Sequence, residues 1–123
     1  MNVVGIGIDI VDVREMGRAI SGKAGEKMIE RTFTKSEFAC AKGCDVNKFA
    51  TTFAAKEATF KAFGTGWLEG HDVEVIREKD TGIPHIVLHG KLMQIAKKRK
   101  IKEALVSLSF ATDYAVATVT LVT

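Results

Sequence analysis

The sequence predicts an α+β fold in which an antiparallel sheet wraps around a long central helix. Three observations lead to this prediction: a period-two segment opens the chain, a breaker-free segment rich in alanine fills its centre, and two hairpin patterns occupy its second half. One strand, several helices, a hairpin, a helix and a hairpin follow in order, whereas a doubly wound sheet would alternate strands and helices. With 123 residues, the chain is expected to form one domain over residues 1–123.

The first predicted strand, VVGIGIDIV at residues 3–11, has two unlike faces. Its even positions carry branched apolar side chains, whereas its odd positions include two glycines and Asp9. The apolar face comprises Val4, Ile6, Ile8 and Ile10. We expect this strand to be central in the sheet, with glycines that leave room for another group to approach closely.

Three helical segments are expected next. Asp12 and Glu15 have the spacing of a capping box and predict a helix through about residue 20. Two glycines then loosen the chain before a second helical piece at about residues 26–31. Thr34 and Glu37 repeat the capping pattern and start a third helix that runs to about residue 42.

The central helix is predicted over about residues 47–63, NKFATTFAAKEATFKAF, which contains no helix breaker. At 100° per residue its four phenylalanines fall within one arc of about 80°, so this helix is expected to carry the core. The four are Phe49, Phe53, Phe60 and Phe63. The helix ends in a C-cap formed by Gly64, Thr65 and Gly66.

Two hairpins flank a basic helix in the second half. The four strands are expected at residues 73–78, 85–89, 104–110 and 114–122. Pro84 lies near the start of the second of these strands, where proline is tolerated. The helix is expected over residues 91–100, with Leu92, Ile95 and Ala96 buried.

Composition and charge exclude several classes of protein. The chain is 46% hydrophobic and 27% charged, and it has neither a segment long enough to span a membrane nor a signal peptide, so we expect a cytoplasmic protein without a membrane partner. Cys40 and Cys44 are expected to be reduced thiols, and the three scattered histidines complete no zinc site with them. A net charge of +3 is too small for a dedicated nucleic-acid binder.

The basic residues are concentrated between positions 91 and 102. Six lysines and arginines there face only Glu103, and the run has two interpretations: a solvated helix face, or a surface for an anionic small molecule or an acidic partner. A nucleic-acid binder that works through Lys97 to Lys102 would need interleaved aromatic residues, which this run lacks.

Two carboxylates are the first candidates for chemistry. Asp9 lies between two isoleucines, where a charge must be paired or bind a cation, unless it is a turn residue or cap at the strand end. Glu57 borders the aromatic arc at about 40° from Phe53, and its alternative role is an ion pair with Lys61. If the two carboxylates converge, they suit a hard divalent cation that keeps several waters and a phosphate oxygen, and Mg²⁺ is the natural occupant.

Three further basic residues are candidates for a role. Lys56 falls inside the phenylalanine arc, where a lysine must snorkel or serve a purpose. Arg14 and Arg18 are i,i+4 neighbours on the first helix, and they form either a solvated patch or a docking site for an acidic protein surface.

Three segments in this order resemble the holo-acyl-carrier-protein synthase family of phosphopantetheinyl transferases: GIGIDIVDVREM, FAAKEATFKAFGTG and VSLSFATDYAVATV. The likeness covers essentially the full chain. It implies a phosphopantetheinyl transferase fold and the transfer of 4′-phosphopantetheine from coenzyme A to a serine of apo acyl carrier protein, with release of adenosine 3′,5′-bisphosphate, for fatty acid biosynthesis. Family members of this short type are homotrimers with active sites between subunits.

The resemblance also assigns roles to residues. Asp9 and Glu57 match the pair that binds Mg²⁺, and Lys61 matches a lysine expected near the phosphates. The loop at the coenzyme A cleft corresponds to Gly64, Thr65 and Gly66. Either Glu57 or a metal-held water accepts the serine proton.

The chain departs from the family pattern at three positions. Many members have arginine where this chain has Thr52, so an anion contact is expected to be weaker. Arg14 stands one place earlier than the usual first-helix arginine, and Phe110 replaces a histidine or another polar residue. These departures keep open the alternative of a non-catalytic trimeric module that binds coenzyme A or a nucleotide.

Overall fold

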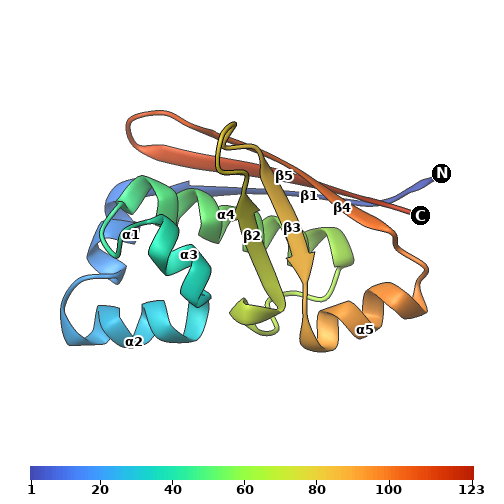
Figure 1. Ribbon diagram of the computed structural model, residues 1–123, viewed down its shortest axis with the longest axis horizontal. Coiled ribbons are helices and arrows are strands. Elements are labelled where there is room, and N and C mark those ends of the chain that lie inside the picture. The colour runs from blue at the N-terminus through green and yellow to red at the C-terminus, as the bar shows by residue number, and fades with distance from the viewer.

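The long helix α4 (Val46–Phe63) lies against one face of a three-stranded antiparallel sheet (Figure 1). The computed structural model describes residues 1–123. The sheet has the order β1–β5–β4, and its strands are β1 (Val3–Asp12), β4 (Glu103–Phe110) and β5 (Tyr114–Val122). The predicted α+β class, with an antiparallel sheet against a long central helix, is confirmed.

The smaller elements cover the other side of α4. They are α1 (Val13–Ala19), α2 (Gly22–Thr32), α3 (Lys35–Cys40), η1 (Gly70–Asp72), β2 (Val73–Arg77), β3 (Pro84–Leu88) and α5 (Gly90–Lys98). Strands β2 and β3 form a separate two-stranded sheet, while α1, α2 and α3 gather at one end of the molecule and α5 lies at the other (Figure 1). Helix α2 starts earlier than predicted, because Gly25 does not loosen the chain but packs against the backbone of Ile20.

Strand β1 is an edge strand, and the prediction that it is central is wrong. Its glycine face packs directly on the backbone of α4: a Cβ at Gly7 would lie 1.9 Å from the Ala58 carbonyl oxygen, and one at Gly5 would lie 2.3 Å from the Ala62 carbonyl oxygen. The branched residues on the opposite face are therefore left outside the core. The strand carries β-branched side chains without being buried on both faces.

The outer face of β1 is consequently apolar and open. Ile6, Ile8 and Ile10 keep 71%, 59% and 63% of their surface exposed, and Leu105 keeps 49%. Leu105 belongs to the same face, because Thr120 pairs with it on one side and with Ile6 on the other. Threonines and serines of β5 and β4 lie between and beside these side chains, so the apolar part of the face is the exposed row on β1. An exposed apolar row of this kind usually marks an interaction site.

The core follows the predicted aromatic arc of α4. Phe49, Phe60 and Phe63 are buried, while the half-buried Phe53 stacks on Trp67 with ring centroids 5.3 Å apart. The inner face of β5 supplies small and branched side chains to the same core, all of them buried: Ala115, Ala117, Val119 and Leu121. Helix α4 therefore joins the sheet to the smaller elements.

Lys56 is buried in an ion pair and does not snorkel. Its Nζ lies 2.8 Å from Glu37 Oε1, with both side chains at most 1% exposed. It also donates to the carbonyl oxygens of Gly70, at 2.8 Å, and Val73, while Glu37 Oε2 accepts from the Val75 amide at 2.7 Å. Burial lowers the pKa of Lys56, and the Glu37 carboxylate opposes that shift. The pair fixes α4 to α3 and to the start of β2.

Local signals at the helix ends act largely as predicted. The Asp12 carboxylate caps α1 by accepting from the Arg14 and Glu15 amides, and the Thr34–Glu37 capping box starts α3.

Cys40 and Cys44 are free thiols. None of the helices has the length and apolar character needed to cross a membrane.

Candidate active site

Strand β1 and helix α4 bring an aspartate, a glutamate and a lysine to one edge of the sheet. Asp9 lies on the glycine face of β1, and its side chain is only 14% exposed. The Lys61 ammonium, from the last turn of α4, lies 2.9 Å from Asp9 Oδ1 and donates to the Ile8 carbonyl oxygen at 3.1 Å. Lys61 therefore pairs with Asp9 across the helix–strand contact, and not with Glu57 along the helix.

The half-buried Glu57 is electrostatically coupled to this pair. Burial raises the pKa of the Glu57 carboxyl, the negative charge of Asp9 raises it further, and the Lys61 ammonium opposes both effects. Asp9 and Glu57 are thus close enough to repel one another. The cluster contains two carboxylates but only one ammonium, that of Lys61, so it carries an excess of negative charge.

The donor set of this cluster fits a hard cation with few protein ligands. No group of three or more histidine, cysteine or acidic side chains gathers anywhere in the molecule. The Asp9 and Glu57 carboxylates are, however, hard oxygen donors, and the negative charge of Asp9 helps to raise the pKa of Glu57, so positive charge is favoured beside them. A divalent ion at this place would complete its coordination with water and with oxygen atoms of a substrate.

The loop after α4 begins at Gly64, three residues beyond Lys61. Gly64 and Gly66 have φ angles of 74° and 70°, and the Thr65 hydroxyl donates to the Gly66 carbonyl oxygen at 2.8 Å. A Cβ added at either glycine would meet no atom within 4 Å, so the backbone of this loop faces open space. The loop leaves access to the Lys61 end of α4.

Helix α1 carries the two predicted arginines on the surface. It starts where β1 ends, a short distance along the chain from Asp9, and both Arg14 and Arg18 are exposed. Arg14 Nε lies 3.7 Å from Asp113 Oδ1, in the turn between β4 and β5. Both side chains remain accessible to a partner.

A second polar cavity, which the sequence did not predict, lies at the opposite edge of the sheet. It has a volume of about 430 Å³ and is bordered by the start of α4, the β2–β3 turn and the end of β4. Lys48 and Arg77 are its basic residues, and the exposed Phe110 stands at its margin. Arg77 donates to the hydroxyls of Thr51 and Thr52. The only sequence signal for this cavity is the pair Thr51 and Thr52 before FAAKE, and it is weak because Arg77, which binds both hydroxyls, is distant in the sequence.

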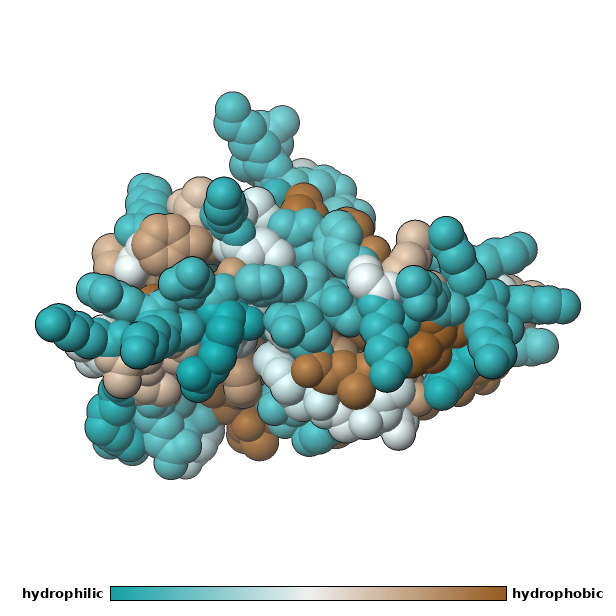
Figure 2. All heavy atoms as spheres, turned by 90° about the horizontal axis from the view of Figure 1, so that it is seen from below, coloured by the Kyte–Doolittle hydropathy of each residue, from teal (hydrophilic) through white to brown (hydrophobic).

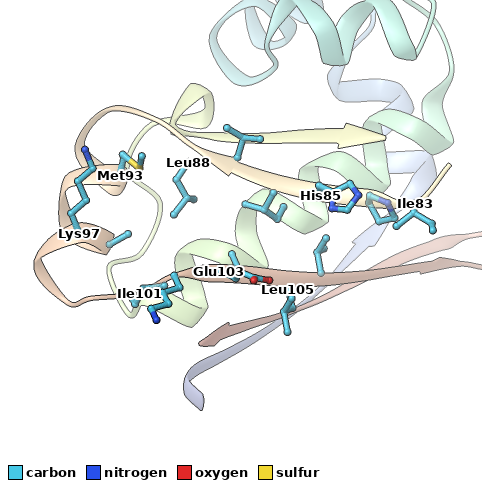
Figure 3. A pocket seen from close by; sticks show the side chains of 15 residues that line it. Ile83, His85, Leu88, Met93, Lys97, Ile101, Glu103 and Leu105 are labelled. Atoms are coloured by element: carbon cyan, nitrogen blue, oxygen red, sulfur yellow. The ribbon is translucent and has the colours of Figure 1, made fainter. Parts of the chain in front are cut away.

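A larger apolar cavity of about 630 Å³ lies between β3, α5 and β4 (Figure 3). Met93 and Lys97 stand at its α5 end and Ile83 and His85 at the other, and it shares only Pro84 and Val106 with the polar cavity. None of the predicted site residues lines it. Hydrophilic side chains project over the end of the molecule that carries α5 (Figure 2).

Comparisons with known proteins show to which superfamily the chain belongs. A family model for the 4′-phosphopantetheinyl transferase superfamily matches residues 5–119. Holo-[acyl-carrier-protein] synthases from Koribacter versatilis and Geobacter sulfurreducens are 41% and 40% identical to it, over 97% of this chain and 98% and 97% of theirs. The chain therefore belongs to the 4′-phosphopantetheinyl transferase superfamily, as the resemblance implied.

Solved structures agree with this assignment. The crystal structure of holo-[acyl-carrier-protein] synthase from Neisseria meningitidis matches with a TM-score of 0.88 and 28% identity, over 99% of this chain and 100% of that one. The enzyme from Helicobacter pylori, in complex with coenzyme A, matches with a TM-score of 0.84 and 27% identity, over 95% and 99%. The fold is that of holo-[acyl-carrier-protein] synthases.

Proposed function

We propose that the chain transfers 4′-phosphopantetheine from coenzyme A to a serine hydroxyl of apo acyl carrier protein and releases adenosine 3′,5′-bisphosphate, for fatty acid biosynthesis in the cytoplasm. One observation carries the proposal: Asp9, Glu57 and Lys61 meet at one sheet edge in a member of this superfamily. Relatives with 40–41% identity over nearly the full chain bear the name of this activity.

Asp9 and Glu57 are proposed to hold Mg²⁺. When bound, this ion supplies positive charge beside the diphosphate of coenzyme A. Lys61 already lies beside Asp9, and its long side chain is exposed. Its ammonium can therefore reach a phosphate oxygen and stabilise the negative charge that develops there. The open backbone of Gly64, Thr65 and Gly66 gives the diphosphate a place to approach Lys61.

Glu57 is also the group of this chain best suited to accept the proton of the attacking serine. Its raised pKa makes it a stronger base than an exposed glutamate. Its partial burial keeps the carboxylate from being fully solvated, and the packing of α4 against β1 fixes its position. Positioning of the serine and the phosphorus supplies much of the rate in such a transfer.

Arg14 and Arg18 are proposed to dock the carrier protein. They are exposed on α1, on the chain segment that follows the Asp9 strand. An acidic protein surface would be attracted to them, and this would act mainly on encounter rate and orientation.

We further propose that the chain acts as a homotrimer with active sites between subunits. The open face that contains Ile6, Ile8, Ile10 and Leu105 supplies an apolar surface for other copies. Asp9 lies on β1 and the polar cavity borders β4, which are the two outer strands of the sheet. A site between copies would bring the β1 edge of one copy to the β4 edge of the next.

The direct test incubates the protein with apo acyl carrier protein, coenzyme A and Mg²⁺, with and without a chelator, and measures the carrier mass. We expect a mass gain of one phosphopantetheine unit that the chelator abolishes. A carrier left unmodified at high protein concentration would refute the proposal. It would favour the alternative of a non-catalytic coenzyme A-binding module, for which the replacement of a polar residue by the exposed Phe110 is the supporting observation.

A further inference from the structure

The ammonium of Lys56 anchors the loop that follows α4 from inside the core. The chain leaves α4 at Gly64 and turns back, so that the carbonyl oxygens of Gly70 and Val73 accept hydrogen bonds from Lys56 Nζ, the first at 2.8 Å. Lys56 lies about two turns before the end of α4, or roughly 10 Å along its axis. The loop of residues 64–70 is therefore held by α4 at both of its ends.

Trp67 holds the middle of the same loop on α4. The centroid of its ring lies 5.3 Å from that of Phe53 and 5.1 Å from that of Phe60. Its side chain is only partly exposed, and the chain contains no other tryptophan. The fluorescence of the protein at tryptophan wavelengths therefore reports on the position of this loop alone.

Glu37 completes the anchor from the other side. Its Oε1 lies 2.8 Å from Lys56 Nζ and accepts from the Thr34 amide at 2.8 Å, while its Oε2 accepts from the Val75 amide at 2.7 Å. No buried polar side-chain atom in the molecule lacks a hydrogen-bond partner, so this network is fully satisfied. The path of the loop is set by α3, α4 and the start of β2 together.

Stability alone does not explain why two charges are buried here. Both side chains are at most 1% exposed, and such a pair is often no more stabilising than apolar side chains of similar size, because both ions lose their water. An apolar residue at position 56, however, could not bind two backbone carbonyl groups at once. What the ion pair adds is a defined path for the segment that follows α4.

This loop is also the one that faces coenzyme A in the proposed function. Gly64 and Gly66 leave its backbone open beside the last turn of α4, which carries Lys61. We propose that Lys56 and Glu37 are positioning residues for coenzyme A: their ion pair fixes residues 64–70 so that the open backbone lies beside Lys61 when the diphosphate binds. This inference rests on the proposed function, because that function identifies the ligand.

The test combines Lys56→Met with Glu37→Gln, which removes both charges and leaves an acceptor for the Val75 amide. Circular dichroism should show a folded protein whose melting temperature changes little. The emission of Trp67 should shift to longer wavelength, and acrylamide should quench it more strongly, because the loop loses its anchor. The kcat/KM for coenzyme A should fall by about 100-fold, the loss that a displacement of about 1 Å can cause. Most of this loss should appear in the KM for coenzyme A, and the KM for carrier protein should change little.

Ser36→Ala is the matched control. The Ser36 hydroxyl donates to Glu74 Oε2 at 2.6 Å, a second polar contact between α3 and β2, which does not involve the loop. This variant should leave both the Trp67 emission and the KM for coenzyme A unchanged. A double variant that melts at a lower temperature but keeps its Trp67 emission and its KM would assign the ion pair to stability alone and overturn the inference.

A measurement on the unmodified protein tests the inference even if the double variant does not fold. NMR relaxation of the backbone amides at residues 65–69 should give order parameters close to the value of about 0.85 that is typical of a rigid backbone. Values below about 0.6 would show a flexible loop and would overturn the inference.

Calorimetry with coenzyme A separates this inference from the proposed function, because binding needs no catalysis. The double variant should bind coenzyme A at least about tenfold more weakly than the unmodified protein. A protein that shows this difference without transferring phosphopantetheine would refute the proposed function and keep the inference. Equal affinities in the two proteins, with transfer intact in the unmodified one, would refute the inference alone.

Discussion

The two outer strands of the main sheet border chemically opposite regions. At β1, Asp9 and Glu57 share a single ammonium and are left with excess negative charge. At β4, Arg77 and Lys48 line a cavity whose only acidic residue, Asp45, caps α4, so the cavity carries an excess of positive charge. One region suits a cation and the other suits an anion, yet β5 separates the two strands. The comparison teaches that the features suited to a cation and to an anion lie at opposite edges of one sheet, so that in the proposed homotrimer they would meet between neighbouring copies.

The largest effect is expected from removing a carboxylate of the acidic region, which is formed by Asp9 and Glu57. Asp9→Ala or Glu57→Ala should reduce transfer to the carrier by about 10²- to 10³-fold or more, since each removes an electrostatic contribution at the reacting phosphorus. Circular dichroism should show an intact fold. Asp80→Asn, which changes an exposed carboxylate in the β2–β3 turn, should leave the rate unchanged. Near-normal transfer in either alanine variant would refute the metal assignment.

A mixing experiment tests whether the two regions act across subunits. Asp9→Ala and Arg77→Gln each impair one region, so a mixed trimer contains some sites with both regions intact. With equal amounts of the two chains and random assembly, about a quarter of the sites are complete. Coexpressed mixtures should therefore show about a quarter of the unmodified transfer rate at limiting coenzyme A. Mixtures no more active than the average of the separate variants would show that each site lies within one copy.

The docking patch lies outside both regions and should behave differently from them. Arg14→Glu with Arg18→Glu should raise the KM for carrier protein by roughly tenfold or more, because like charges now oppose an acidic partner. The KM for coenzyme A should change little. Steady-state kinetics with each substrate varied in turn measures both values, and an equal rise in the two would argue against a docking patch.

The smallest expected effect is a change in the pKa of Glu57. Asp9→Asn removes a negative neighbour and frees Lys61, so the pKa of Glu57 should fall, whereas Lys61→Met should raise it. A carboxyl whose folded pKa lies above its unfolded value contributes stability below the unfolded pKa, and this is lost as pH rises through the folded pKa. Asp9→Asn should weaken that pH dependence. Carbon NMR titration of the Glu57 carboxyl measures both shifts.

Much of the fold and the acidic region could be predicted because their signals are local. The aromatic arc, the caps of Asp12 and Thr34, and the Asp9 and Glu57 motifs each lie within one short segment. The position of β1 was predicted wrongly, because branched residues mark a strand but do not say which of its faces is buried. The buried partner of Lys56 depends on how α3 packs on α4, which no periodicity encodes.

The polar cavity was missed for the same reason. Arg77 stands at the end of a short strand and shows no pattern of its own, and its threonine partners are 25 and 26 residues away. Only the packing of β2 against α4 brings the three side chains together. The sequence therefore did not show that Arg77 and Lys48 line one cavity.

The contact between Gly7 and the Ala58 carbonyl oxygen has a consequence for the neighbouring carboxylates. Ala58 follows Glu57 directly, and Gly7 is two residues from Asp9 on the same face of its strand. A single methyl group at residue 7 would clash with the Ala58 carbonyl oxygen and force α4 away from β1. The distance between the Asp9 and Glu57 carboxylates, and with it the fit of the proposed metal site, therefore depends on the absence of a side chain at residue 7.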